Sequence, residues 1–489
     1  MPHAEAVAIA RGRVLAVGTR EELRSHRGLR TEVLGRSDAA IVPGFIDAHL
    51  HFLALARRSS ETDCSAPGCR SIPEILTRIE KAAADRPAGA WVRAFGYDEF
   101  FLEEKRPPSL AEVDAVLPRH PLRLLHRTGH LAVLNSTALQ ALGLDAASGG
   151  KRVERDERGR PTGLVHEPGR LLHDRLPHAN PEELAALCAA ASVRLLSAGI
   201  TSFHDPTPGQ GWDDVARLQR FVADGAIQQR LRVYGTMDCF ARTEQHPPGS
   251  SAKEMGRAGR FRLGGVKIVL DEESDAEEFA ERLAEADRAE AQVAIHAVEG
   301  GPLAHAIAGL RRLGPERVRR RRHRLEHASL CPPALAAEIA EVGATVVTHP
   351  GFLFRFGEKY HAEVPPEQRD WLYPIRRYLD LGIPVALGSD APIDLPSPLA
   401  AIQAAVERRT ESGNLLGESQ AITVSEALSL HTSRAAVAGF DEDRLGRISV
   451  GAPADAVLLA ADPTAVPVRD ISAIPVQATI LDGRIAWSA

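Results

Sequence analysis

Two histidines one residue apart, His49 and His51, follow the apolar run of residues 41–46 (IVPGFI). In an extended strand, residues i and i+2 point to the same face, so both imidazoles can bind one metal ion while Leu50 turns away. The run before them is typical of a strand buried on both sides, as in a parallel barrel. Barrel enzymes hold their catalytic residues at the carboxyl ends of such strands. The pair therefore indicates a metal site, provided that later strands bring further ligands.

Later strand-like segments do bring such side chains. A fourth predicted strand carries a lysine, the fifth and sixth end in histidine, and the eighth ends in aspartate. The joint pattern is much harder to obtain by chance than any single member. Imidazoles and carboxylates suit Zn²⁺ and also Mn²⁺, Fe²⁺ or Ni²⁺. We predict a divalent metal centre, with zinc favoured and one or two ions, at His49, His51, Lys267, His296, His327 and Asp390.

The residue types suit metal-assisted hydrolysis. A bound divalent ion lowers the pKa of its water from about 16 toward roughly 7 and polarises a carbonyl group. Asp390 can bind the metal, accept the proton of that water and deliver it to a leaving nitrogen. A buried Lys267 is costly as an ammonium ion. It is expected to be neutral, carboxylated by CO₂ so that it bridges two metals, or paired at the rim with Asp271 or Glu272.

These side chains require a barrel to position them. From residue 181 onward, strand-like runs alternate with amphipathic helices, and residues 41–46 add the first strand. Eight such units predict an α/β fold, a distorted TIM barrel. The expected strands are 41–46, 199–203, 230–235, 264–270, 292–295, 322–326, 344–347 and 384–388.

Two further regions do not fit the alternation. The segment at about 55–185, between the first two barrel strands, reads as a functional insertion because a connection this long is rarely a bare loop. Short β segments at both ends, 1–42 and 440–489, predict one small β-sandwich beside a barrel of residues 43–439. Hairpin turns are expected at residues 11–13 and 482–483, since each contains a glycine that takes positive φ at little cost.

Bulk properties narrow the function class. A chain of 489 residues is too long for one simple hydrophobic core, so a large domain with an accessory domain is expected. The formal charge of −6 does not indicate the positively charged surface that binds nucleic acid. No stretch has the roughly 18 apolar residues of a membrane helix, and no signal peptide is evident. Five scattered cysteines indicate neither a disulfide framework nor a zinc ribbon. The expectation is a cytoplasmic protein that acts on a small molecule, binds neither nucleic acid nor membrane, and is compatible with a homodimer.

The motifs resemble the amidohydrolase superfamily. The stretch VPGFIDAHLH, the strand-borne lysine, the two later histidines and GSDAP carry the resemblance. Finer features are similar to the amidohydrolase 3 group, the branch that includes N-substituted formamide deformylases; they are RTGHLAVLNSTAL, GRPTGLVHE, GGVKIVLD and PVALGSDAPIDLPSPLAAIQAAVERR. The resemblance implies a distorted TIM barrel with a β-sandwich from both termini, and metal-dependent hydrolysis of a non-peptide C–N bond.

The resemblance also implies roles for single residues. The six predicted ligands carry over by position, with His327 and Asp390 also catalytic, and Arg127 and His130 of the RTGH motif would contact substrate. His204, Asp205 and His349 end other strands and are expected either to contact ligands or substrate or to be structural.

Two departures leave alternatives open. The loop after Lys267 reads DEESDAEEF where the branch usually has DG-S-x-G, and the fifth strand reads His296-Ala-Val-Glu299 where the branch usually has HAIGD. A catalytic Glu299 would favour an aminohydrolase that deaminates a heterocycle or guanidine-like group; otherwise Glu299 is a carboxylate at a helix N-terminus. A third alternative is a barrel that serves as a non-catalytic scaffold. We predict hydrolysis of an amide, N-formyl or N-acyl bond.

Overall fold

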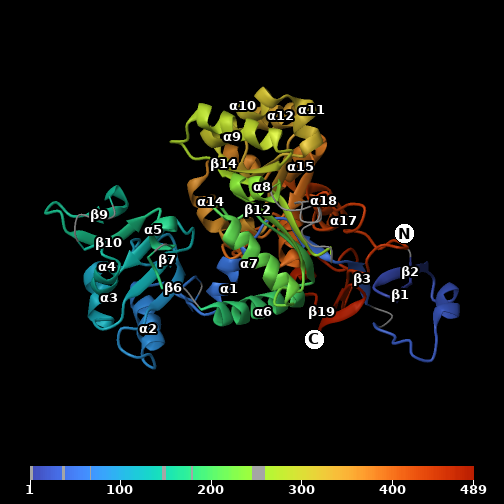
Figure 1. Ribbon diagram of the computed structural model, residues 1–489, viewed down its shortest axis with the longest axis horizontal. Coiled ribbons are helices and arrows are strands. Elements are labelled where there is room, and N and C mark those ends of the chain that lie inside the picture. Colours follow the sequence, from blue (N-terminus) through green and yellow to red (C-terminus); the bar gives the residue numbers. More distant parts are fainter. Residues whose placement is uncertain are drawn as a thin grey trace. The chain divides into compact units, whose positions relative to one another are not determined.

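The computed structural model describes residues 4–35, 39–66, 68–145, 150–173, 175–177, 180–244 and 259–489. The chain divides into two compact units, one of Met1–Leu53 with Cys188–Ala489 and the other of Ala54–Leu187. Helices α1 (Phe52–Arg58) and α6 (Pro181–Ser197) span the two boundaries in the chain (Figure 1). The predicted domain limits at 42, 55, 185 and 440 stay predictions.

Eight parallel strands form the core of the first unit, and they confirm the predicted α/β barrel. In spatial order they are β17 (Val385–Leu387), β16 (Thr345–Thr348), β15 (Arg324–Leu330), β14 (Gln292–Glu299), β13 (Phe261–Val269), β12 (Arg230–Gly235), β11 (Ile200–Asp205) and β4 (Phe45–Asp47). Every residue of β11 and β12 is buried, as expected for strands covered on both faces. Backbone bonds from Ala48 to Leu387 and from His51 to Ala391 join the first strand to the last and nearly close the barrel.

Helices cover the outside of these strands. They are α7 (Trp212–Ala223), α8 (Met237–Glu244), α9 (Ala276–Arg288), α10 (Gly300–Leu313), α11 (Pro315–Arg321), α12 (Pro333–Val342), α13 (Gly351–Arg355), α14 (Gly357–Glu363), α15 (Ile375–Asp380), α16 (Pro398–Glu407), α17 (Val424–Leu430) and α18 (Ser433–Ala438). Helices α9, α10 and α12 pack side by side (Figure 1). Asp275 caps α9 by accepting bonds from two backbone N–H groups. Within the described ranges, none of the helices combines the length and apolar character that crossing a membrane requires.

The apolar run 41–46, expected as one strand, serves two sheets. Ala40–Pro43 forms β3, which pairs with β18 (Ala456–Leu459), and the chain enters barrel strand β4 only after Gly44. A Cβ at Gly44 would lie 2.1 Å from Oγ1 of Thr201 on β11. The absence of a side chain at Gly44 therefore allows the chain to pass from one sheet to the other.

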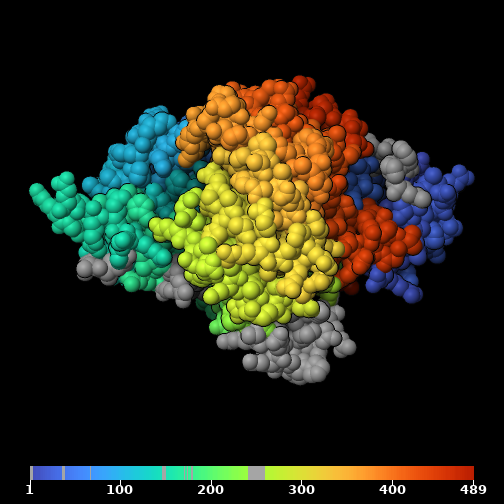
Figure 2. Space-filling view, turned by 90° about the horizontal axis from the view of Figure 1, so that it is seen from above, coloured from blue at the N-terminus to red at the C-terminus, as the bar shows by residue number. Residues whose placement is uncertain are grey.

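Strands from both chain ends come together. Strand β3 joins β18, β19 (Val476–Leu481) and β20 (Arg484–Ser488) in one sheet, and β1 (Ala6–Ala10) pairs with β2 (Arg13–Gly18) in a hairpin. Both predicted turns form, with Gly12 and Gly483 at positive φ. The red C-terminal residues accordingly lie beside the blue N-terminal ones in the space-filling view (Figure 2). The short helices of this unit are η1 (Glu22–His26), η3 (Pro366–Trp371), η4 (Glu418–Gln420) and η5 (Val468–Ala473).

The second unit has its own sheet and core. Its six strands run in the order β5 (Thr62–Asp63), β6 (Val92–Tyr97), β7 (Leu122–His126), β8 (Leu131–Leu134), β10 (Pro161–His166) and β9 (Val153–Arg155). The helices are α2 (Ile72–Ala83), α3 (Leu110–Val116), α4 (Ser136–Ala141), α5 (Gly169–His173) and η2 (Gly150–Arg152). Capping by Ser71, Ser109 and Asn135 fixes where α2, α3 and α4 begin.

Candidate metal centre

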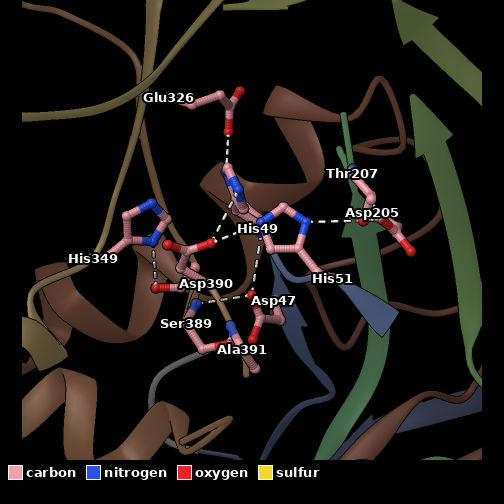
Figure 3. Close-up of polar contacts among 12 residues, drawn as sticks. Asp47, His49, His51, Asp205, Thr207, Glu326, His349, Ser389, Asp390 and Ala391 are labelled. Atoms are coloured by element: carbon pink, nitrogen blue, oxygen red, sulfur yellow. Dashed lines mark hydrogen bonds and ion pairs between the residues drawn. The ribbon is translucent and has the colours of Figure 1, made fainter. Parts of the chain in front are cut away.

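The two histidines that follow β4 converge on the aspartate that follows β17 (Figure 3). Asp390 Oδ1 lies 3.0 Å from His51 Nε2 and 3.4 Å from His49 Nε2. The His49 and His51 rings are 5.2 Å apart, and one potential ligand atom from each of the three residues lies within 4.8 Å of the others. The side chains that follow β4 and β17, more than 330 residues apart in sequence, thus meet at one point.

The local path of the chain differs from the expected extended strand. Strand β4 ends at Asp47, and residues 48 and 49 form a bend. The bend is held by Asp47 Oδ1, which accepts bonds from the backbone N–H groups of His49 and Ser389. Burial raises the pKa of Asp47 to about 6, against these two stabilising bonds. His49 and His51 still face the same site, because His51 and Asp390 bond to backbone carbonyls of the opposite segment.

A second group of histidines shares His49. His327, which lies within β15 and does not end it as the sequence predicted, has its ring 5.1 Å from His49 and 4.8 Å from His349. Potential ligand atoms of these three buried residues also lie within 4.8 Å of one another. The half-buried His296 ring on β14 is 4.4 Å from His327. The structure therefore gathers the four predicted histidines and adds His349.

The backbone is strained where these ligands sit. His327, Ala328 and Asp390 have φ angles of 73°, 44° and 57°, in the left-handed region that residues other than glycine seldom adopt. Such conformations persist only where the surrounding structure enforces them, and they cluster at functional sites.

Lys267 extends from β13 with 4% of its surface exposed. Its Nζ has no hydrogen-bond partner among the described residues, so the expected alternative of an ion pair at the rim with Asp271 or Glu272 is not found there. Burial lowers the pKa of Lys267 to about 8, although the charges of Glu326 and Asp390 oppose this shift. Neutral amine, the form that can react with CO₂, is therefore more abundant than for an ordinary lysine, at about one-tenth of the side chain at pH 7.

Each imidazole is oriented through its other ring nitrogen. His49 Nδ1 lies 2.5 Å from Glu326 Oε2, and His51 Nδ1 lies 2.8 Å from Thr207 Oγ1 (Figure 3). Nδ1 of His349 bonds to the carbonyl of Gly388 at 3.0 Å. Ligand histidines in metal proteins are typically held in this way, with Nε2 directed at the metal.

The partners of these imidazoles are themselves anchored. The guanidinium of Arg324 donates to both oxygens of Glu326, at 2.7 and 2.9 Å, and also reaches Tyr234 and the carbonyl of Ala48. Thr207 donates to Asp205, which also accepts a bond from the backbone N–H of Phe52. Arg324 and Glu326 are fully buried, so the His49 orientation rests on a rigid ion pair inside the barrel.

The local electrostatics favour ligation. Burial, reinforced by neighbouring charge, holds the pKa values of His49 and His327 well below the ordinary range, which leaves both rings neutral. Burial alone raises the pKa of Asp390, but the adjacent rings of His51, His49 and His349 together lower it below its usual value. Neutral imidazoles around an ionised carboxylate are the forms that bind a divalent metal.

The orphaned atoms of the site fit a metal ion. His49 Nε2, His349 Nε2 and Lys267 Nζ are buried and have no hydrogen-bond partner among the described residues. Unpaired buried polar groups are costly, and several at one site require an explanation such as an ion. The donor set of imidazole nitrogens and carboxylate oxygen suits zinc and related divalent ions.

Three other strand-end residues have different surroundings. His204 is buried against Arg324, and burial with that charge holds its pKa well below the ordinary range. Glu299 is exposed at the beginning of α10 and belongs to neither ligand group. Asp205 supports Thr207 and therefore His51, one of the contacts to ligands that the sequence suggested.

The predicted substrate contacts lie in the second unit. His130 is exposed and its Nδ1 lies 2.9 Å from Glu167, whereas Arg127 donates to Asp98 at 2.7 Å. Their role toward substrate stays a prediction. Asp98, Glu99 and His126 form another group whose ligand atoms lie close together, but the Asp98 carboxylate is already engaged by Arg127.

The barrel and the cluster at the carboxyl ends of its strands define the class of protein, a metal-dependent barrel hydrolase. A family model described as "Amidohydrolase family" matches residues 37–486. The chain belongs to the amidohydrolase family.

Three similar proteins agree with this membership. An N-substituted formamide deformylase of Arthrobacter pascens is 28% identical, over 99% of this chain and 95% of its own. A structure described as an uncharacterised metal-dependent hydrolase of Pyrococcus horikoshii OT3 has a TM-score of 0.74 at 21% identity, over 95% of each chain. The atrazine chlorohydrolase TrzN of Arthrobacter aurescens TC1, complexed with zinc, has a TM-score of 0.56 at 16% identity and shares the fold, over 99% of this chain and 90% of its own. The predicted class is confirmed: the protein is an enzyme, a metal-dependent hydrolase of C–N bonds.

Proposed function

We propose that this enzyme hydrolyses an N-acyl or N-formyl bond of a small molecule at the centre formed by His49, His51, Asp390 and their neighbours. The convergence of His49 Nε2 and His51 Nε2 on Asp390 carries the proposal. The likeness to an N-substituted formamide deformylase supports formamides as the first substrates to test.

The ligand set of this proposal extends the predicted one. One or two zinc ions would be held by His49, His51, His296, His327, His349, Asp390 and a carboxylated Lys267. When bound, the metal supplies Lewis-acid activation of water and of the substrate carbonyl.

The protein side chains would move the protons. The ionised Asp390 accepts the proton of the attacking water and delivers it to the leaving nitrogen. His327 would stabilise the charge that develops on the carbonyl oxygen of the substrate. Arg127 and His130 stay the predicted substrate contacts. Glu326 and Thr207 keep His49 and His51 in place throughout.

Deamination remains the second prediction, and the position of its acid disfavours it. Glu299 would have to protonate a ring nitrogen at the centre, yet it is exposed at the beginning of α10 and outside both ligand groups. Changing Glu299 to Gln would abolish deamination but leave amide hydrolysis intact.

The proposal is tested by assaying zinc-loaded enzyme on matched N-alkyl formamides, N-alkyl acetamides and amino-heterocycles. We expect release of amine from the formamides, loss of activity after chelation, and recovery on adding zinc. Asp390→Asn should lower turnover by about 10²-fold or more. Asp380→Asn, an exposed carboxylate on α15, serves as the control. Ammonia release from the heterocycles without amide hydrolysis would contradict the proposal.

Several broader expectations stay predictions. They are a cytoplasmic location, a homodimer, and a β-sandwich domain limited to 1–42 and 440–489. Each needs its own measurement, such as fractionation, sedimentation and limited proteolysis.

A further inference from the structure

Arginine is the most frequent residue in the lining of a cavity of about 1250 Å³ in the first unit. Among the seventeen described residues that line it, seven are arginines and two are aspartates. Arginine makes up 53 of the 489 residues, so a random draw from this composition would place about two there. The arginines are Arg11, Arg13, Arg230, Arg260, Arg444, Arg447 and Arg484.

The cavity lies at the opposite end of the barrel strands from the metal centre. Arg230 is the first residue of β12, and Arg260 directly precedes β13. Lys267, by contrast, is close to the carboxyl end of β13. Because the eight strands are parallel, their amino and carboxyl ends lie on opposite faces of the barrel. The metal chemistry therefore does not account for these arginines.

Two hairpin turns build one wall of the cavity. A Cβ at Gly483 would lie 2.9 Å from the Cα of Gly12, so the β1–β2 and β19–β20 turns are in close contact. Bonds from Ala454 to Gly12 and from Gly483 to Ala454 tie both turns to one segment. This packing brings Arg11 of one hairpin and Arg484 of the other to the same cavity.

Internal carboxylates neutralise only part of this charge. Asp455 and Asp482 pair with Arg230, and Asp482 also pairs with Arg260 at 2.7 Å. Arg13 and Arg444 donate only to backbone carbonyls among the described residues, those of Gly451 and Gly259.

Three guanidinium groups have no partner in the part of the chain that the structure describes. Arg11, Arg447 and Arg484 form no hydrogen bond or ion pair with any residue that the structure describes. The remaining lining carboxylate, Asp443, can offset one of these charges at most. Burial and the charges of Arg262 and Arg230 lower the pKa of Arg444, as expected where like charges crowd together.

We propose that this arginine-lined cavity binds a small metabolite that carries two or more phosphate groups. The guanidinium fork bonds two phosphate oxygens at once, and unpaired positive charges from three separate segments exceed what one monoanion needs. The volume admits a molecule of the size of a sugar bisphosphate. Binding there is independent of the proposed amide hydrolysis, because the residues are not shared.

The proposal is tested by titrating fructose 1,6-bisphosphate into the metal-loaded, full-length enzyme in a calorimeter at low ionic strength. The variant Arg11→Gln/Arg447→Gln/Arg484→Gln removes the three unpaired charges. The matched control, Arg282→Gln/Arg288→Gln/Arg320→Gln, removes three exposed arginines from α9 and α11 and changes the net charge equally. Metal content and melting temperature of both variants establish that the barrel is intact.

We expect one saturable site per chain, weakened about tenfold or more in the cavity variant and less than about twofold in the control. Equal weakening in both variants, or no saturable binding by the unaltered enzyme, would overturn the proposal.

Glucose 6-phosphate and inorganic phosphate serve as single-phosphate probes. If either probe binds as tightly as the bisphosphate does, the assignment of the ligand class is overturned. If the triple variant does not fold, the single change Arg484→Gln on the exposed hairpin replaces it, with a severalfold loss expected and no loss contradicting the proposal.

Discussion

His49 and Glu326 form a hydrogen bond of 2.5 Å between Nδ1 and the carboxylate, and both side chains are buried in the barrel. The bond directs the proton of His49 to Nδ1 and leaves Nε2 free toward Asp390. Arg324 donates hydrogen bonds to both oxygens of Glu326. The orientation of His49, which follows the first barrel strand, therefore depends on an ion pair within the sixth barrel strand.

Glu326→Gln should weaken metal binding by about 10–100-fold, the usual cost of losing such a supporting contact. The amide cannot offer His49 the same charged acceptor. Metal dissociation constants from competition with a chromogenic chelator would measure the effect, and Glu326→Asp should restore part of the affinity because it keeps the charge.

The control for this change is Asp455→Asn, which breaks another buried arginine–carboxylate pair at the amino end of the barrel. It should also lower stability, since either variant leaves a buried guanidinium with fewer partners. If both variants bind metal as well as the unaltered enzyme does, Glu326 has no role in orienting His49.

Lys267 should take up CO₂, because its buried amine has a lowered pKa of about 8 and no hydrogen-bond partner among the described residues. Carbon-13 NMR after equilibration with labelled bicarbonate should show one carbamate signal, and bicarbonate should raise the number of metal ions per chain. Lys267→Arg should lack the signal, whereas Lys359→Arg on α14 should keep it. A spectrum without a carbamate signal in the metal-loaded enzyme would exclude this modification.

Gly44→Ala should destabilise the first unit by about 1–3 kcal/mol, the range for forcing extra atoms into a packed site. The new methyl group would meet Oγ1 of Thr201 at 2.1 Å. Chemical denaturation would measure the change, with Gly28→Ala as the control because the nearest atom there is 4.0 Å away. Equal denaturation midpoints for the two variants would show that the passage from β3 to β4 tolerates a side chain.

Acid should destabilise the protein through His323. Burial lowers its pKa to about 4, and its Nδ1 accepts a bond from the backbone N–H of Val293. The unfolded chain binds this proton near pH 6.5 and the folded chain only near 4, so stability is full above 6.5 and falls as pH drops to 4. The loss amounts to about 3 kcal/mol for a shift of this size.

His323→Asn isolates this contribution, because the amide oxygen can replace Nδ1 as the acceptor without titrating. Urea unfolding at several pH values between 4 and 7 should show a shallower pH dependence in the variant. An unchanged slope would mean that other groups account for the acid sensitivity.

Much of the fold could be predicted because most barrel strands are short, largely apolar runs that alternate with amphipathic helices. The prediction went wrong just after the first strand, where the backbone that carries His49 and His51 was expected to be extended but bends at residues 48 and 49. Asp47 ends the strand by bonding to His49 and to Ser389, a residue 342 positions later that no local pattern reveals.

The site could be predicted in part for the same reason. The sequence placed His349 at a strand end but did not identify it as a candidate ligand, because its ring is oriented by the carbonyl of Gly388, directly after the next strand. The partnership of His49 with Glu326 joins residues 277 positions apart and leaves no mark on the spacing. The neighbouring His327 was the available signal, since RLEH begins a buried strand with three polar side chains.

Anomalous X-ray diffraction at the zinc edge, on crystals of the zinc-loaded enzyme, would locate the metal. We expect a peak at about 2.0–2.2 Å from His49 Nε2, His51 Nε2 and an Asp390 oxygen. Absence of a peak there, or a peak confined to Asp98, Glu99 and His126 of the second unit, would contradict this expectation.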